Sequence, residues 1–150
     1  MPPRIVSGGQ TGVDRAALDV ALELGLDCGG FCPRGRRADD GRIPERYPLI
    51  ETSSRGYAQR TSWNVRDSDA TLVLHLGRLQ GGTALTLRLA RRLGRPCLAV
   101  DLGSDPHAAR TIRDWLGRSR PRVLNVAGPR ESVAPGIAAR VRTILRAALD

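Results

Sequence analysis

The sequence predicts an α/β fold in which a doubly wound, mainly parallel sheet carries helices on both faces. Two observations lead to this prediction. Short apolar runs typical of buried strands alternate with segments of helical periodicity, and glycine-rich stretches separate two of the strands from the helices that follow. Because parallel strands need crossover connections, the alternation indicates helices on the faces of the sheet. Residues 1–150 are expected to form one domain, since this length suits one continuous core.

The first third of the chain is expected to hold three strands, one helix and a long loop. RIVSG (residues 4–8) is short and apolar enough for a strand, and residues 11–24 place apolar side chains at helical spacing. LDCGGFC (26–32) is predicted to be the second strand. Residues 33–48 are rich in Arg, Asp, Gly and Pro without an apolar period, which predicts a loop. PLIET (48–52) follows as a short strand.

The remainder of the chain alternates helices and strands. After a helix over residues 57–69, the run ATLVLHL (70–76) is the clearest buried strand, because it holds no Asp, Glu or Arg. The later elements are expected at 83–94 (helix), 96–102 (strand), 105–117 (helix), 122–128 (strand) and from Pro135 onward (helix). In that last helix, one face carries residues at core spacing: Ile137, Val141, Ile144, Leu145 and Ala148.

The charge of the chain favours a small anionic ligand as the partner. All 24 basic residues are Arg, and the net charge is +9 at pH 7. These arginines are scattered along the chain, without a basic tail and with few aromatic residues for base stacking, so no specific nucleic acid is expected as a partner. Guanidinium groups match phosphate geometry bidentately, which suits a smaller anion.

The apolar segments and cysteines narrow the class of protein. No uncharged apolar run of about 18 residues is present, so no membrane partner is expected. The first residues lack the apolar stretch of a secretory signal, and a cytoplasmic location is therefore expected. Cys28, Cys32 and Cys97 have no paired C-x-x-C spacing, which predicts reduced, buried thiols rather than disulfides or a zinc site.

Two glycine-rich turns are the candidate ligand site. Gly8, Gly9 and Gly12 stand where the first strand passes into the first helix, and Gly81 and Gly82 stand at a second such junction. Glycine lets backbone N–H groups approach an anion closely, and the N-terminus of a helix adds partial positive charge. Since ligands of parallel sheets bind at the carboxyl ends of the strands, the two turns are expected to form one anion or nucleotide pocket.

Several long motifs resemble one protein family. SGGQTGVDRAALD, PRGRRADDGRIPERYPL, YAQRTSWNVRDSDATLVL and GGTALTLRLARRLGRPCLAVDL are similar, in this order, to the molybdenum cofactor carrier proteins. That family belongs to the Rossmann-like superfamily that also contains the Lonely-guy phosphoribohydrolases and lysine-decarboxylase-like proteins. The resemblance covers about residues 5–102. It implies a Rossmann-like carrier that binds and protects the molybdenum cofactor (molybdopterin), a phosphate-bearing pterin with a dithiolene-held metal, before molybdoenzymes receive it.

The resemblance also assigns candidate ligand contacts. One anionic group would lie at the first turn, among these residues: Gly8, Gly9, Gln10, Thr11 and Gly12. A second would lie at Gly81, Gly82, Thr83 and Thr86. The loop arginines are either cationic clamps over the ligand or a solvated surface: Arg34, Arg36 and Arg37.

Four polar residues each have two interpretations. Asp14, beside Arg15, is either a contact to a pterin or ribose edge or a first-turn carboxylate favoured by the helix dipole. Asn64, Asp67 and Asp69 lead into the strong strand, where ligand contact and capping roles both fit. By analogy with relatives of this fold, a homo-oligomer is expected.

An enzyme remains the alternative to a non-catalytic binding protein. The phosphoribohydrolases carry a PGGxGTxxE motif whose Glu assists cleavage of an N-glycosidic bond, whereas this chain has QGGTALTLR, with Thr86 and no carboxylate. His75 is expected in the core and His107 on a helix surface, and neither belongs to an evident catalytic triad. A binding protein for the molybdenum cofactor or a nucleotide is therefore favoured over a nucleotide phosphoribohydrolase-like enzyme.

Overall fold

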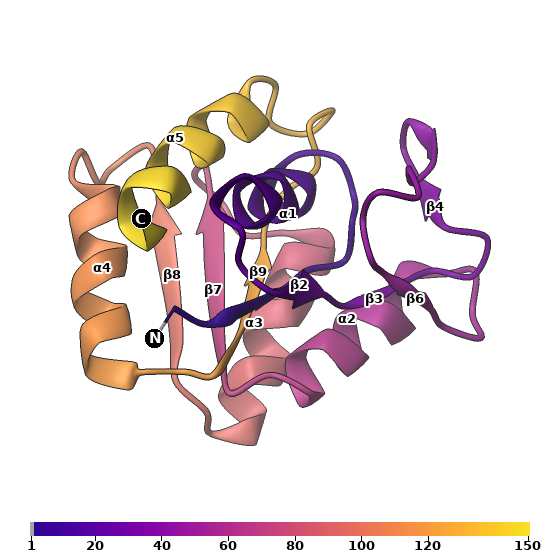
Figure 1. Ribbon diagram of the computed structural model, residues 1–150, viewed down its shortest axis with the longest axis horizontal. Helices are drawn as coiled ribbons and strands as arrows, with labels where there is room; N and C mark the ends of the chain where they lie inside the picture. The colour runs from indigo at the N-terminus through magenta and orange to yellow at the C-terminus, as the bar shows by residue number, and fades with distance from the viewer. Residues whose placement is uncertain (1) are drawn as a thin grey trace.

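A five-stranded parallel sheet forms the centre of the molecule, in the strand order β2-β1-β9-β7-β8 (Figure 1). This computed structural model describes residues 2–150. The strands of the sheet are β1 (Arg4–Val6), β2 (Cys28–Gly29), β7 (Ala70–His75), β8 (Cys97–Asp101) and β9 (Val123–Ala127). Every residue of β7 is buried, as expected for an apolar strand that has a neighbour on each side and helices on both faces.

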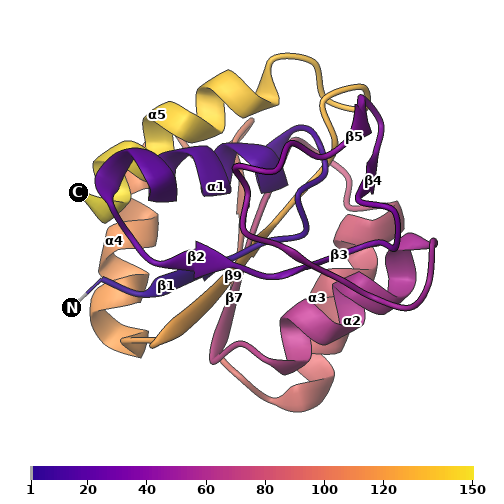
Figure 2. The same ribbon diagram turned by 45° about the vertical axis from the view of Figure 1, so that its right-hand side comes forward.

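Five helices cover the two faces of this sheet. They are α1 (Val13–Leu24), α2 (Tyr57–Arg66), α3 (Gly81–Leu93), α4 (Ala108–Ser119) and α5 (Ile137–Leu149). Helix α5 packs between α1 and α4 on one face, and α2 packs against α3 on the other (Figures 1 and 2). The predicted doubly wound α/β fold is thus confirmed.

The core lies between the sheet and the helices on its faces. Ile5, Leu72 and Leu124 come from three neighbouring strands and are fully buried. On α5, the predicted core face is buried at Ile137, Val141, Leu145 and Ala148, while Ile144 is partly exposed. Cys28 and Cys32 are buried thiols, and Cys97 is partly buried.

The predicted strand 26–32 divides at Gly30. β2 pairs with β1, whereas β3 (Phe31–Cys32) pairs with β6 (Ile50–Glu51) in a separate parallel pair. Gly30 has φ 128°, and a Cβ there would lie 2.4 Å from the Ser7 carbonyl oxygen. The close approach of two backbones therefore ends one sheet and starts the next.

The predicted loop over residues 33–48 contains a short antiparallel hairpin. Its strands are β4 (Arg37–Ala38) and β5 (Gly41–Arg42), joined by Asp39 and Asp40. In Figure 2 this hairpin projects beside the carboxyl ends of the central strands. The segment also buries Ile43 and Tyr47, two residues too isolated to show an apolar period.

The helix ends differ slightly from prediction. α3 begins two residues earlier than expected, at Gly81, and α2 ends at Arg66 rather than residue 69. α4 begins at Ala108, since Asp105 accepts hydrogen bonds from the His107 N–H and the Thr111 hydroxyl just before it. Of the helices within residues 2–150, none combines the length and apolarity needed to span a membrane.

Candidate functional site

A cleft of about 850 Å³ opens at the carboxyl ends of β1, β9 and β7. Its walls come from the turn after β1, the first two turns of α2, the turn between β7 and α3, and the loop between β9 and α5. The helix after β9 covers one face of the sheet and the helix after β7 covers the other, so the connections diverge here. Open parallel sheets bind ligands at such a topological switch point.

The glycines of the first turn pack against protein. A Cβ at Gly9 would lie 2.5 Å from Leu49 Cδ1, and one at Gly12 would lie 2.4 Å from the Pro129 carbonyl oxygen. Gly8 lines the cleft, but a Cβ there would meet the Arg60 guanidinium at 2.5 Å. The lack of a side chain at these three glycines therefore lets neighbouring segments of the chain approach closely.

Asp14 occupies the N-terminal end of α1, beside the cleft. The residue is 7% exposed, and its carboxylate lies close to the backbone N–H groups of Gln10 and Gly128 and 3.9 Å from Arg60 Nη1. Burial raises the pKa of Asp14 from 3.8 to about 6, although Arg60 and the two N–H groups lower it in part. The anion at this helix N-terminus is thus the protein's own carboxylate.

The second turn is open. Within residues 2–150, the N–H groups of Gly81, Gly82 and Thr83 have no hydrogen-bond acceptor, and Gln80 provides no side-chain cap. A Cβ at Gly81 or Gly82 would meet nothing within 4 Å. Thr83 and Thr86 are buried at the same wall, and the Thr86 hydroxyl donates to the Gly82 carbonyl. This helix N-terminus therefore presents three free donors to the cleft.

Arginines gather around Tyr57, a residue of the cleft wall. The guanidinium carbons of Arg37, Arg60 and Arg130 lie 5.1, 5.1 and 5.3 Å from the centre of its ring. Arg60 is buried and donates to the Gly8 carbonyl at 2.7 Å. Arg130 also lines the cleft, whereas Arg37 reaches Tyr57 from the hairpin and donates to the Arg55 carbonyl.

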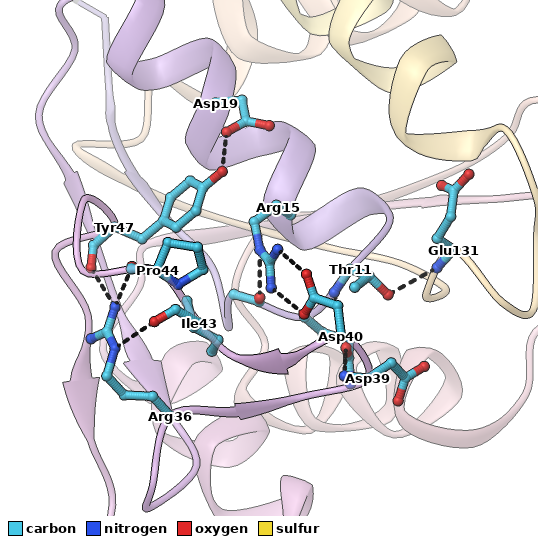
Figure 3. Close-up of polar contacts among 12 residues, drawn as sticks. Thr11, Arg15, Asp19, Arg36, Asp39, Asp40, Ile43, Pro44, Tyr47 and Glu131 are labelled. Carbon is cyan, nitrogen blue, oxygen red and sulfur yellow. Dashed lines mark hydrogen bonds and ion pairs between the residues drawn. The ribbon is translucent and has the colours of Figure 1, made fainter.

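The structure does not bring Arg34 or Arg36 to the cleft. Arg34 is exposed. The guanidinium of Arg36 is buried and donates to the carbonyl oxygens of four residues, as Figure 3 shows in part: Ile43, Pro44, Tyr47 and Leu49. All three nitrogens of Arg36 thus bind the chain's own segment, and four of its five N–H donors are used there.

Thr11, Arg15 and Asn64 likewise form contacts within the protein. The Thr11 hydroxyl accepts the Glu131 N–H, and Arg15 binds the Gly9 carbonyl and Asp40 (Figure 3). Asn64 borders the cleft, but its side-chain amide pairs in both directions with the backbone of Phe31.

Nearer to β7, two aspartates have capping or ion-pair roles and one histidine is buried. Asp69 accepts the N–H groups of Arg122 and Val123, and Asp67 pairs with Arg66. His75 is buried as expected, although it also borders the cleft.

Gln10 connects the cleft to the hairpin. Its Oε1 accepts the N–H groups of Thr11 and Asp39, both at 2.9 Å, and its Nε2 is buried without a partner among residues 2–150. Asp39 in turn accepts hydrogen bonds from Arg130 and Ser132 of the β9–α5 loop. The hairpin is therefore fastened to the rim of the cleft.

Sequence reasoning missed Tyr57, Arg60 and the β9–α5 loop. The signals were present. Arg60 shares a helix face with Asn64, four residues later, and the predicted strand 122–128 ends at Gly128 and is followed by Pro129. The carboxyl end of this strand had to lie at the same sheet edge as the carboxyl ends of the other parallel strands. Of the turns between a strand and a helix, only the two richest in glycine entered the prediction.

The fold and the cleft define a Rossmann-like α/β protein with its candidate site at the switch point of the sheet. The chain belongs to the circularly permutated YpsA SLOG family, whose model matches residues 5–149. It is also similar to a 1.45 Å crystal structure from Syntrophus aciditrophicus SB, of a protein named "putative molybdenum carrier protein". The two are 42% identical with a TM-score of 0.95, over 99% of this chain and 97% of that one. No curated protein matches this chain significantly. The predicted family resemblance is confirmed.

Proposed function

We propose that this protein binds the molybdenum cofactor in the cleft and protects it until molybdoenzymes receive it. The observation that carries the proposal is the open α3 N-terminus, whose three free N–H groups border a cleft of about 850 Å³. These donors suit the terminal phosphate of the pterin. The name of the 42% identical neighbour supports the same cargo.

The surroundings of the cleft fit an anionic ligand. Arg60 and Arg130 supply positive charge at the wall, where both guanidinium groups contact the Tyr57 ring. In this proposal the metal is held by the dithiolene of the cargo. Among residues 2–150, no group of three or more His, Cys, Asp or Glu side chains is placed to hold a metal ion.

Mass spectrometry of small molecules released from gently purified protein tests the proposal. Expressed in a host that makes the cofactor, the protein should carry a phosphate-bearing pterin. Gly82→Leu should carry less than about a tenth of it, because the new side chain covers the free N–H groups. Gly117→Leu is the matched control, since Gly117 is also helical, exposed and free of neighbours within 4 Å. Protein from such a host that releases no pterin contradicts the proposal.

A nucleotide phosphoribohydrolase-like activity is the second candidate. The observation in its favour is Asp14, a carboxyl group at the cleft with a pKa of about 6, suited to proton transfer near neutral pH. The carrier proposal predicts no free base above background from nucleoside monophosphates. If the wild-type protein releases free base and Asp14→Asn does not, the enzyme proposal replaces the carrier proposal.

A further inference from the structure

The side-chain amide of Gln10 is incompletely satisfied by the chain. The residue is 4% exposed and borders the cleft, and its Nε2 has no hydrogen-bond partner within residues 2–150. A buried N–H group without an acceptor is destabilising, so native proteins rarely retain one without a reason. At a residue that lines the cleft, a ligand is one source of the missing acceptor.

The orientation of this amide is fixed. Oε1 accepts the N–H groups of Thr11 and Asp39, each at 2.9 Å. Rotating the amide by half a turn would set the Nε2 donor against two other donors and lose both hydrogen bonds. Gln10 therefore keeps Nε2 as an unpaired donor at a residue that borders the cleft, and it cannot exchange this donor for an acceptor.

Asp14 places an acceptor beside this donor. Its carboxylate lies close to the backbone N–H of Gln10, and both residues line the cleft. Each carboxylate oxygen has a second lone pair, and Arg60 at 3.9 Å supplies a compensating charge. A neutral donor next to two carboxylate oxygens complements a ring edge that carries one acceptor followed by two donors.

We propose that Gln10 and Asp14 read the 2-amino-4-oxo edge of a planar heterocycle: Gln10 Nε2 donates to the ring carbonyl, and Asp14 accepts from the ring N–H and the amino group. This inference rests on the proposed function, and it names the part of the ligand distant from the phosphate. Pterins and guanine share this edge. Xanthine replaces the amino group by a second carbonyl, which would face the Asp14 carboxylate.

Calorimetric binding of GMP and XMP tests the proposal, since the two nucleotides share the phosphate and ribose. The wild-type protein should bind GMP at least tenfold more tightly than XMP at neutral pH. Asp14→Asn should remove or reverse that preference, because its amide can donate to the second carbonyl of xanthine. Loss of stability alone cannot reverse a preference between two ligands.

Gln10→Glu provides the second variant. It keeps the oxygen that accepts from Thr11 and Asp39 but replaces the Nε2 donor by an oxygen. GMP should then bind at least tenfold more weakly, while circular dichroism and thermal unfolding confirm the fold.

The outcomes separate this inference from the proposed function. Equal binding of GMP and XMP by the wild type, or an unchanged preference in Asp14→Asn, overturns the reading of the ring edge and leaves the phosphate site in place. If neither nucleotide binds and inorganic pyrophosphate does not bind either, the phosphate site fails, and this inference fails with it.

Discussion

Asp14 gives the protein a titratable group that opposes folding at neutral pH. Its pKa is raised from 3.8 to about 6, chiefly by burial, so the folded state holds the proton more tightly than the unfolded state. The stability contributed by the protonated group is complete below pH 3.8 and is lost as the pH rises through about 6. Asp14 therefore destabilises the protein above that range.

Asp14→Asn removes this titration. The unfolding free energy of the variant relative to the wild type should increase by about 2 kcal/mol between about pH 4 and pH 8, at about 1.4 kcal/mol per pKa unit and with part of the unfolded-state titration already complete at pH 4. Urea unfolding of both proteins at several pH values measures the difference. A difference that stays constant with pH would show that Asp14 has an ordinary pKa in the folded protein.

At the scale of elements, Arg36 organises the segment between β3 and β6. This segment has little secondary structure of its own, and the buried guanidinium collects carbonyl groups that no strand or helix satisfies (Figure 3). A buried carbonyl without a donor is unfavourable, so one side chain replaces several backbone hydrogen bonds. The hairpin can then contact the rim of the cleft through Asp39.

Arg36→Met should lower the unfolding free energy by about 3 kcal/mol, because the alkyl chain remains while the Ile43 and Leu49 carbonyls lose their donor. Amide hydrogen exchange should quicken over residues 34–50. Arg34→Met is the control, because Arg34 is exposed. Its effect should stay within about 0.5 kcal/mol. Equal effects of the two substitutions would rule out this role for Arg36.

The elements with a strong apolar period were predictable, and the contacts that assemble the site were not. β7 was predictable because its buried residues form an unbroken apolar run, and α5 because its buried residues recur at helical spacing. The break at Gly30 depends on the Ser7 backbone, 23 residues away, and the carbonyls that Arg36 binds are brought together only by folding. The two glycine turns look alike in sequence, yet Gly12 packs against Pro129 while Gly82 stays open. That difference lies in tertiary contacts.

At the scale of the whole molecule, the strand order explains where the cleft lies. Counting β9 and α5 as the first strand and helix of the chain turns the order β2-β1-β9-β7-β8 into 3-2-1-4-5, the usual doubly wound order. In that order the first turn after a strand binds phosphate in many dinucleotide-binding proteins. Here the corresponding turn is the β9–α5 loop, which lines the cleft. The circular permutation of the family thus moves a wall of the site to the end of the chain.

This relation predicts that the permutation can be reversed. Both termini lie at the same end of the molecule, and α5 is tied to α1 by the Arg146–Glu23 ion pair (Figures 1 and 2). Joining them by a Gly/Ser linker of about eight residues and opening the chain between Arg120 and Pro121 would make β9 the first strand. The new ends fall between α4 and β9, outside the cleft lining.

The permuted protein should fold with the same circular dichroism spectrum, unfold cooperatively and bind GMP within about threefold of the original affinity, because the contacts of the sheet and cleft do not depend on the order of connection. A linker of the same length inserted at Gly117–Arg118 of α4, without permutation, is the control for added chain, and it should be more damaging because it interrupts a helix packed on the core. A permuted chain that fails to fold while this control folds would show that the connection from α4 to β9 is required to bring the last strand into the centre of the sheet.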